Sequence, residues 1–160
     1  MHPSIQIAPD FDALYPTASA TATECAMNLV LTADLLVKRI ATLLQPFNIM
    51  PASGLVLSTM ADPETPLPPK DITDRLIVSR AIVTGLLDSL ERQIYIRRLP
   101  HLSDRRMILI KITETGRKVV NDFGPIAHQH QKQWLEVLDK TEQQQFIIRL
   151  KFLALYCFIQ

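Results

Sequence analysis

The segment between residues 93 and 117 has the pattern of one β-hairpin with a charged tip that leads directly into a helix. Its flanks, residues 93–96 and 107–110, are rich in β-branched and apolar side chains that favour paired strands. Pro100 and Ser103 lie in the loop between them. Four arginines surround this loop: Arg97, Arg98, Arg105 and Arg106. Guanidinium groups on two projecting strands make a poor hydrophobic core and are well suited to contacts with phosphate groups.

The basic residues of the chain are concentrated around this hairpin. The 160-residue chain has a formal net charge of only +1. Residues 70–118 contain eleven Lys and Arg against six acidic residues, a net charge of +5, and the rest of the chain contains six basic and ten acidic residues, a net charge of −4. A basic module inside an acidic frame is typical of a local nucleic-acid surface in a neutral protein. Double-stranded DNA is therefore the expected partner.

The first long helix is predicted over residues 18–45, after an N-terminal arm at 1–17 that contains three prolines. Apolar residues recur in it at alternating steps of four and three, as in a heptad stripe. The stripe consists of Ala22, Ala26, Leu29, Ala33, Leu36, Ile40 and Leu43. It fits a buried core helix or a helix between two subunits, and its width favours the second.

Residues 46–112 are predicted to form a winged helix-turn-helix. Short helices are expected over 53–61 and 70–76, and Ser79 is a natural N-cap for a third over 80–92. In the third helix the core face is assigned to Ile82, Leu86, Leu87 and Leu90, and an exposed face near the start to Arg80, Val83 and Thr84. The hairpin that follows supplies the wing.

Residues 113–160 are predicted to form two further helices that join 18–45 in a dimerisation region. Thr113 is expected to cap a helix to about residue 138, with a kink at Gly124 and Pro125. Thr141 and Gln144 have the spacing of a capping box for the last helix, whose apolar residues lie almost all round it. Such a helix must be buried, and one winged helix cannot cover it, so a homodimer is expected. The fold class is α+β and mostly α.

In three stretches the chain resembles the MarR family of transcriptional regulators (multiple-antibiotic-resistance regulator type). The resemblance is carried by residues 71–76, by residues 79–91, and by Asp104-Arg105-Arg106 followed by Ile112-Thr113-Glu114-Thr115-Gly116, which is similar to the wing signature of the family. Two positions depart from the family pattern: Gln93 stands where a glycine is usual, and Met50 precedes Pro51 where a Ser or Thr cap is usual.

The resemblance implies an obligate homodimer in which the first and last helices intertwine and two winged helices bind a palindromic operator. It also implies repression that is relieved by a small phenolic or lipophilic ligand or by oxidation. A cofactor is not implied. The alternative is an interaction protein, a winged helix that has lost operator binding and holds a partner protein.

The expected DNA contacts fall on the third short helix and on the wing. Ser79, Arg80, Val83 and Thr84 are placed to meet base edges, Arg80 as a bidentate donor to guanine and the methyl groups of Val83 and Thr84 against thymine methyls. In the wing, Asp104 is expected to orient Arg106 for the minor groove while Arg105 binds a phosphate, or the two arginines exchange roles. The competing interpretations are a solvated helix face and a charged loop that serves solubility.

Other chemistry has little support in the sequence. Cys25 roughly matches the position of the reactive cysteine in the peroxide-sensing branch of the family, so it is a candidate redox sensor, although an inert buried thiol is the alternative. His128 and His130 are two residues apart on a helix and cannot chelate a metal together. No catalytic constellation stands out, so an enzyme is not expected. Without a signal peptide or an uninterrupted apolar span, the expected location is the cytoplasm and no membrane partner is expected.

Overall fold

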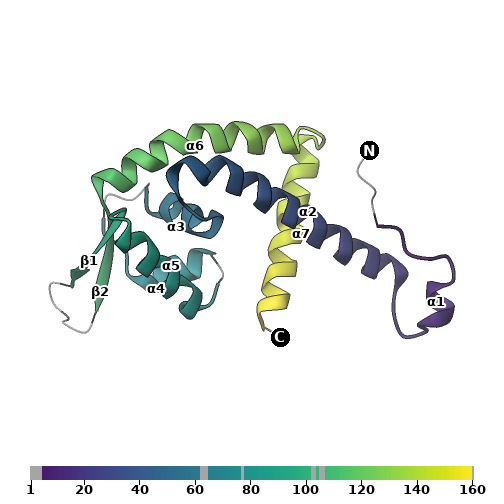
Figure 1. Cartoon of the computed structure of the whole chain (residues 1–160). Helices are drawn as coiled ribbons and strands as arrows, with labels where there is room; N and C mark the ends of the chain where they lie inside the picture. The colour runs from purple at the N-terminus through teal and green to yellow at the C-terminus, as the bar shows by residue number, and fades with distance from the viewer. Residues whose placement is uncertain (1–4, 62–64, 77, 102–103, 105–106, 160) are drawn as a thin grey trace. The chain divides into compact units, whose positions relative to one another are not determined.

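The computed structural model describes residues 5–61, 65–76, 78–101, 104 and 107–159. It consists of helices and one two-stranded antiparallel sheet (Figure 1), which confirms the predicted fold class. The chain separates into two units, Met1–Thr42 and Leu43–Gln160.

The first unit contains a short helix α1 (Phe11–Leu14) and most of the long helix α2 (Ala20–Leu44). Asn28 of α2 binds the preceding segment, because its side chain accepts from the backbone N–H of Ile5 at 3.2 Å and donates to the carbonyl oxygen of Ile5 at 3.0 Å. The described part of the predicted arm at 1–17 therefore contains a helical turn, and both Ile5 and Asp12 form hydrogen bonds to α2. Much of the apolar surface of α2 is exposed, including Met27, Val30, Leu31, Leu35 and Val37.

The second unit contains the hydrophobic core and the winged helix. Helices α3 and α4 precede the longer helix α5, which packs on both of them, and α6 packs on α3. The elements are η1 (Gln45–Phe47), α3 (Pro51–Ala61), α4 (Pro69–Leu76), α5 (Arg80–Arg92), β1 (Ile96–Pro100), β2 (Ile108–Ile112), α6 (Glu114–Leu135) and α7 (Lys140–Ile159). The largest fully buried side chains are Leu57, Ile72, Leu90, Ile96, Ile110, Val56 and Val83.

Helix α5 buries a different face from the predicted one. Ser79 is its N-cap, as predicted, and the Ser79 hydroxyl accepts from the backbone N–H of Ile82 at 3.4 Å. Val83, Leu87 and Leu90 face the core, with Val83 only 1% exposed, whereas Ile82 is 54% exposed. The assignment of Val83 to the exposed face and of Ile82 to the core is therefore wrong, because α5 packs on α3 and α4 along the 83–87–90 row.

The hairpin is confirmed, with its first strand displaced along the chain from the prediction. Strand β1 runs from Ile96 to Pro100 and pairs with β2 so that Arg97 lies opposite Lys111 and Arg98 lies opposite Ile110. Residues 93–95 form the turn between the end of α5 and the start of β1 and are not part of the strand. Leu67 adds one further backbone bridge to Ile110, with N–H···O distances of 2.9 and 2.7 Å. This bridge fixes the loop before α4 to the root of the wing.

The junction between α5 and the wing is a Schellman motif with an unusual residue in it. The N–H of Tyr95 donates to the carbonyl oxygen of Leu90 at 3.0 Å and that of Ile94 donates to Glu91 at 2.9 Å, the two bonds of this motif. Gln93 keeps an ordinary φ of −85°, and Ile94 takes the left-handed φ of 62°. The missing glycine is thus accommodated by a strained β-branched residue one position later, while the Gln93 side chain donates to the carbonyl oxygen of Asn48 at 2.9 Å.

Replacing Ile94 by glycine is expected to stabilise the fold. A left-handed backbone costs an L-residue about 1–2 kcal/mol, and Ile94 is 69% exposed, so little apolar burial is lost with its side chain. We expect Ile94→Gly to raise the free energy of unfolding by about 1 kcal/mol in urea denaturation. Ile94→Ala removes most of the same side chain but keeps a Cβ atom, and it should gain much less. Equal gains from both variants would contradict backbone strain as the cause.

Each of the last two helices begins with a side-chain cap. Thr113 caps α6 as predicted, accepting from the N–H of Gly116 at 3.0 Å, and α6 continues through Pro125. The predicted capping box of Thr141 and Gln144 is wrong. Asp139 accepts from the N–H groups of Thr141 and Glu142, and the Glu142 carboxylate accepts from the N–H of Asp139 at 2.8 Å. The helix therefore begins at Lys140, because Asp139 is the better-placed acceptor.

Candidate nucleic-acid interface

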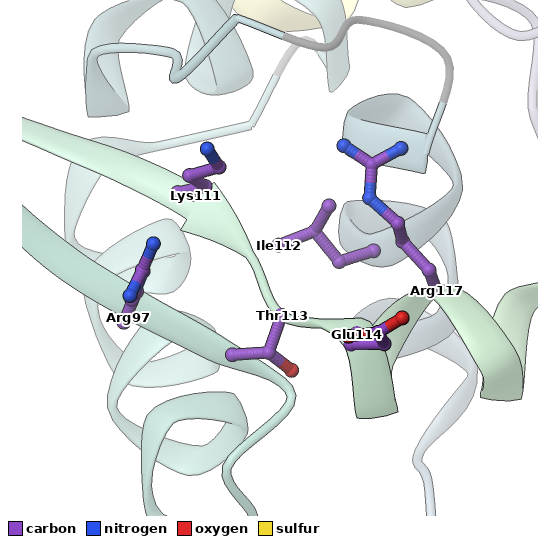
Figure 2. A pocket seen from close by; sticks show the side chains of 6 residues that line it. All are labelled: Arg97, Lys111, Ile112, Thr113, Glu114 and Arg117. Atoms are coloured by element: carbon purple, nitrogen blue, oxygen red, sulfur yellow. The ribbon is translucent and has the colours of Figure 1, made fainter.

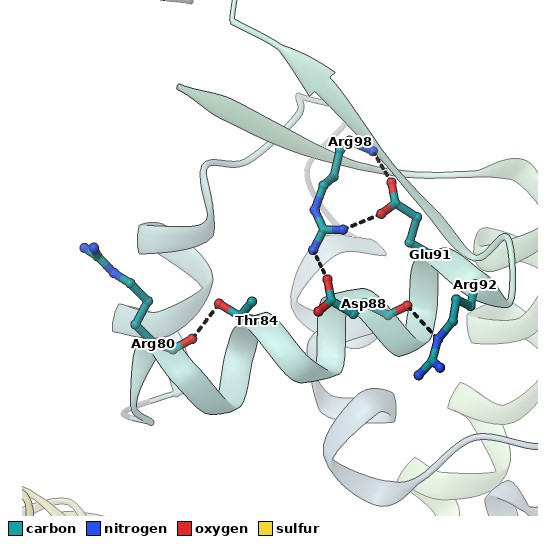
Figure 3. A network of polar contacts seen from close by, with 6 residues as sticks. All are labelled: Arg80, Thr84, Asp88, Glu91, Arg92 and Arg98. Atoms are coloured by element: carbon teal, nitrogen blue, oxygen red, sulfur yellow. Dashed lines mark hydrogen bonds and ion pairs between the residues drawn. The ribbon is translucent and has the colours of Figure 1, made fainter. Parts of the chain in front are cut away.

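The start of α5 presents a polar face to solvent. Ser79, Arg80 and Thr84 are all exposed, and the hydroxyl of Thr84 donates to the carbonyl oxygen of Arg80 at 2.9 Å (Figure 3). Among the described residues, the Arg80 guanidinium forms no ion pair. Val83 is buried, and the exposed Ile82 lies two residues from both Arg80 and Thr84, so it points to a different side of α5.

A second cation lies near Arg80 at the start of α4. The hydrogen bond from Lys70 to Asp74, at 2.7 Å, raises the pKa of Lys70 above its ordinary value. The positive charge of Arg80, the smallest of the influences on this group, opposes the shift. Lys70 therefore interacts only weakly with Arg80, and its charge is already paired with Asp74.

Arg98 joins the wing to α5. Its guanidinium pairs with Asp88 at 2.5 Å and with Glu91, and its backbone N–H donates to Glu91 at 3.1 Å (Figure 3). The hydrogen bond with Asp88 holds the pKa of Arg98 above its ordinary value, although partial burial lowers it. The Arg98 side chain is 30% exposed. Two carboxylates of α5 thus hold the Arg98 side chain and fix the angle between β1 and α5. The sequence alone had suggested a DNA contact for this arginine.

The other wing residues are placed differently. Arg97 is exposed on the opposite face of β1, since neighbouring residues of a strand point to opposite sides. Asp104 is exposed in the turn, where its N–H donates to Nδ1 of His101 at 3.2 Å and its carbonyl oxygen accepts from Met107 at 3.0 Å. Arg105 and Arg106 lie outside the described residues, so the orientation of Arg106 by Asp104 stays a prediction.

Asp88 and Glu91 are functional candidates that the sequence interpretation missed. They are three residues apart on α5 and so share one face of the helix, which could have indicated a common partner. The identity of that partner, Arg98, depends on the register of the hairpin.

The remaining predicted site is the candidate redox sensor Cys25, which lies in α2 of the first unit. Cys25 and Cys157 are free and exposed, in contrast to the buried thiol that was the alternative for Cys25. Within the described ranges, no group of three or more His, Cys, Asp or Glu side chains could hold a metal ion. Over the same residues no single helix is long and apolar enough to span a membrane, although the bent pair Ala20–Phe47 and Pro51–Met60 meets the length and composition requirement.

Parts of this chain are similar in sequence to known proteins. Residues 55–108 match the model of the MarR family. The uncharacterised HTH-type transcriptional regulator YfiV of Bacillus subtilis is 32% identical over 74 residues, which are 46% of this chain and 46% of YfiV. The HTH-type transcriptional repressor YetL of the same organism is 37% identical over 59 residues, which are 37% of this chain and 35% of YetL. The matched segments thus span less than half of either relative.

The fold is also similar over most of the chain to solved structures. The Staphylococcus aureus MepR–DNA complex superposes with a TM-score of 0.74 at 23% sequence identity, covering 80% of this chain and 94% of MepR. This likeness establishes the fold. Residues 55–108, which contain α4, α5, β1 and most of α3, are similar to the MarR family.

Proposed function

We propose that this chain is a transcriptional regulator, not an enzyme, that binds double-stranded DNA as a homodimer in the cytoplasm. The proposal rests on the exposed polar face at the start of α5, where Arg80 forms no ion pair with any described residue. Arg98 holds the hairpin against the same helix by its ion pair with Asp88 (Figure 3). In a winged helix the start of this helix enters the major groove and the wing lies along the flanking backbone. MepR, which shares the fold, is bound to DNA in its structure.

Residues of α5 are assigned to contacts with base edges, and residues of the wing are assigned mainly to contacts with DNA phosphates. Arg80 is assigned a bidentate bond to guanine, and Val83 is removed from the assigned thymine contacts because it is buried. Ser79 and Thr84 are assigned to base edges beside Arg80. Arg97, Arg105 and Arg106 are assigned to phosphate or minor-groove contacts, and Asp104 to orienting Arg106. Arg98 acts mainly by positioning the wing, because Asp88 and Glu91 already occupy its guanidinium.

Dimerisation is supported by the apolar surface that one chain leaves uncovered. Helix α7 exposes Phe152 and Tyr156 by 70% and 66%, and several of its other large apolar residues by 40% or more. Uncovered apolar patches of this kind mark association surfaces. A two-fold dimer would present two copies of α5 to a palindromic operator, with half-sites about one helical turn apart.

Loss of Arg80 is expected to reduce operator affinity and sequence preference together. Removing one bidentate base contact costs about 1–3 kcal/mol, so Arg80→Ala should bind the operator about 5- to 150-fold more weakly. It should also relax base preference at one position in each half-site. The measurement is fluorescence anisotropy with DNA from upstream of the gene and with random DNA, across a salt series.

Arg92 offers a matched control at the opposite end of the same helix (Figure 3). It is exposed, and its Nε donates to the carbonyl oxygen of Asp88 at 3.4 Å. Arg92→Ala should therefore change specific affinity much less than Arg80→Ala. If neither the wild type nor either variant prefers the upstream DNA, the alternative of a winged helix that binds a partner protein takes over.

We further propose that the protein represses transcription and that a small ligand releases it from DNA. Occupying a palindromic operator blocks transcription, and YetL, the relative that is 37% identical over 59 residues, is a repressor. Release is assigned to a small lipophilic or phenolic ligand in preference to oxidation of Cys25.

Peroxide is accordingly expected to act equally on the wild type and on Cys25→Ser. A sensing thiol must be accessible and activated as a thiolate. Cys25 is exposed, but no hydrogen bond to its thiol is found among the described residues. DNA release is measured by anisotropy before and after peroxide, with Cys157→Ser as the matched control. Peroxide release that vanishes only in Cys25→Ser would assign the switch to this cysteine.

A further inference from the structure

A pocket of about 470 Å3 opens at the root of the wing, on the face of the hairpin opposite Arg98. Strands β1 and β2 form one side of it and the first turn of α6 forms the other (Figure 2). Its volume is within the range of small-molecule sites in proteins. The lining residues are Arg97, Lys111, Ile112, Thr113, Glu114 and Arg117.

The charges around this pocket are unbalanced. Arg97 and Lys111 lie directly opposite each other on the paired strands, an arrangement in which like charges repel. Arg117 adds a third cation from α6, and among the described residues Glu114 is the only acidic one that lines the pocket. Among the residues that the structure describes, none of the three cations forms an ion pair. Lys111 and Arg117 are half-buried, so their side chains are partly held against the walls of the pocket.

Hydrogen bonds of Thr113 hold the backbone at the floor of the pocket. None of these bonds uses a cationic side chain of the lining. Ile112 is 4% exposed beneath the charges. The hydroxyl of Thr113 donates to the carbonyl oxygen of Ile94 at 2.7 Å and accepts from the N–H of Gly116 at 3.0 Å. The backbone N–H of Thr113 donates to the carbonyl oxygen of Tyr95 at 3.0 Å. The walls are thus fixed before any ligand binds, which reduces the entropy cost of binding.

We propose that this pocket binds a small dianion, such as a phosphate monoester or a short dicarboxylate. Three cations and one carboxylate leave a net charge of +2 facing the cavity, which matches two negative charges. A dianion there would relieve the repulsion between Arg97 and Lys111 and compensate the half-buried Lys111 and Arg117. The site differs from the apolar surfaces of α2 and α7, and its ligand differs in chemistry from a lipophilic inducer.

Dianion binding would also oppose DNA binding, a consequence that rests on the proposed function. Arg97 lines the pocket and is also one of the wing arginines assigned to DNA phosphates. An arginine that holds the dianion is withdrawn from the DNA backbone. The ligand is therefore expected to lower DNA affinity without blocking α5 itself.

The binding step is tested with inorganic phosphate and with succinate, each titrated against the full-length protein at constant ionic strength and pH 7.5, with acetate as the monoanion control. Stabilisation by a ligand grows with its concentration relative to Kd, so the shift in melting temperature gives Kd. Lys111→Gln and Arg117→Gln should each weaken binding about tenfold or more, since each removes a charge-assisted contact. Glu114→Gln should tighten binding, because it removes the only opposing charge.

Lys118→Gln is the matched control, since Lys118 is an exposed cation next to Arg117 in sequence that does not line the pocket. It should leave the Kd of the dianion unchanged. Melting temperatures of all variants in chloride verify that each one folds. Equal stabilisation of wild type, Lys111→Gln and Arg117→Gln by phosphate would overturn the proposal, as would equal effects of phosphate and acetate on the wild type.

A second measurement separates the small dianion from a DNA phosphate as the occupant. Phosphate should reduce DNA affinity of the wild type at constant ionic strength and should do so much less in Arg117→Gln. If Arg117→Gln instead weakens DNA binding and neither dianion binds the wild type, the pocket holds the DNA backbone and the proposal is wrong. If the protein binds no DNA at all, the proposed function fails while the titrations of the dianion still decide this inference.

Discussion

Replacing Phe152 of α7 by glutamate should weaken self-association of this protein by about a hundredfold or more. Phe152 is 70% exposed in the single chain, so a monomer would tolerate the change or gain solubility from it. In the proposed dimer the same side chain is buried twice by symmetry, and full burial of one such side chain is worth about 1.5–3 kcal/mol. Placing two carboxylates in that interface adds a desolvation cost. Sedimentation equilibrium over a range of protein concentrations measures the change.

Gln144→Glu is the matched control for this variant. Gln144 is exposed in the same helix, and the substitution introduces the same charge near the helix N-terminus, where a negative charge is favourable. It should leave the association constant unchanged within about threefold. A wild type that remains a well-folded monomer at micromolar concentration would contradict the dimer, whatever the two variants do.

Replacing Gly116 by alanine should lower the free energy of unfolding by about 3 kcal/mol or more. A Cβ atom at this position would lie 2.2 Å from the carbonyl oxygen of Tyr95 and 2.9 Å from Cγ1 of Ile112. Overpacking of a core typically costs about 1–3 kcal/mol, and here the obstacle is backbone, which moves less easily than a side chain. The Tyr95 oxygen also accepts from the N–H of Thr113, so its displacement weakens the junction between the wing and α6.

Gly85→Ala provides the control, because it is the same substitution inside a helix. No atom lies within 4 Å of a Cβ atom built at Gly85, so alanine should stabilise α5 by about 0.5–1 kcal/mol. Urea denaturation of both variants compares them directly. If Gly116→Ala were as stable as the wild type, α6 could not approach the root of the wing as closely as the structure places it.

Local sequence signals predicted the order of the elements and several of their ends. Ser79 and Thr113 cap α5 and α6 as expected, because a hydroxyl that accepts a helical N–H acts within a few residues of chain. The hairpin was also recognisable, since two β-branched runs separated by a polar loop favour strand pairing without help from the rest of the fold. The family motifs of residues 79–91 and 104–116 predicted the similarity to the MarR family, and the matched model covers much of this region.

The burial of α5 could not be predicted from its own residues. Ile82, Leu86 and Leu90 form one helical row, while Val83, Leu87 and Leu90 form another. Both rows are apolar and share Leu90, so the period of 3.6 residues fits either one. Packing on α3 and α4 selects the second row and leaves Ile82 outside. The composition of the candidate base-reading surface therefore depends on tertiary contacts.

The long helices, the hairpin and the local excess of positive charge could be predicted, because each depends on residues close together in the chain. The partner of each charge could not, because it depends on how the hairpin packs against the helices. Arg97 and Arg98 are neighbours of the same type, yet one lines an open cationic pocket and the other pairs with Asp88 and Glu91. A strand alternates its faces, and only the packing of the hairpin against α5 and α6 determines what each face meets.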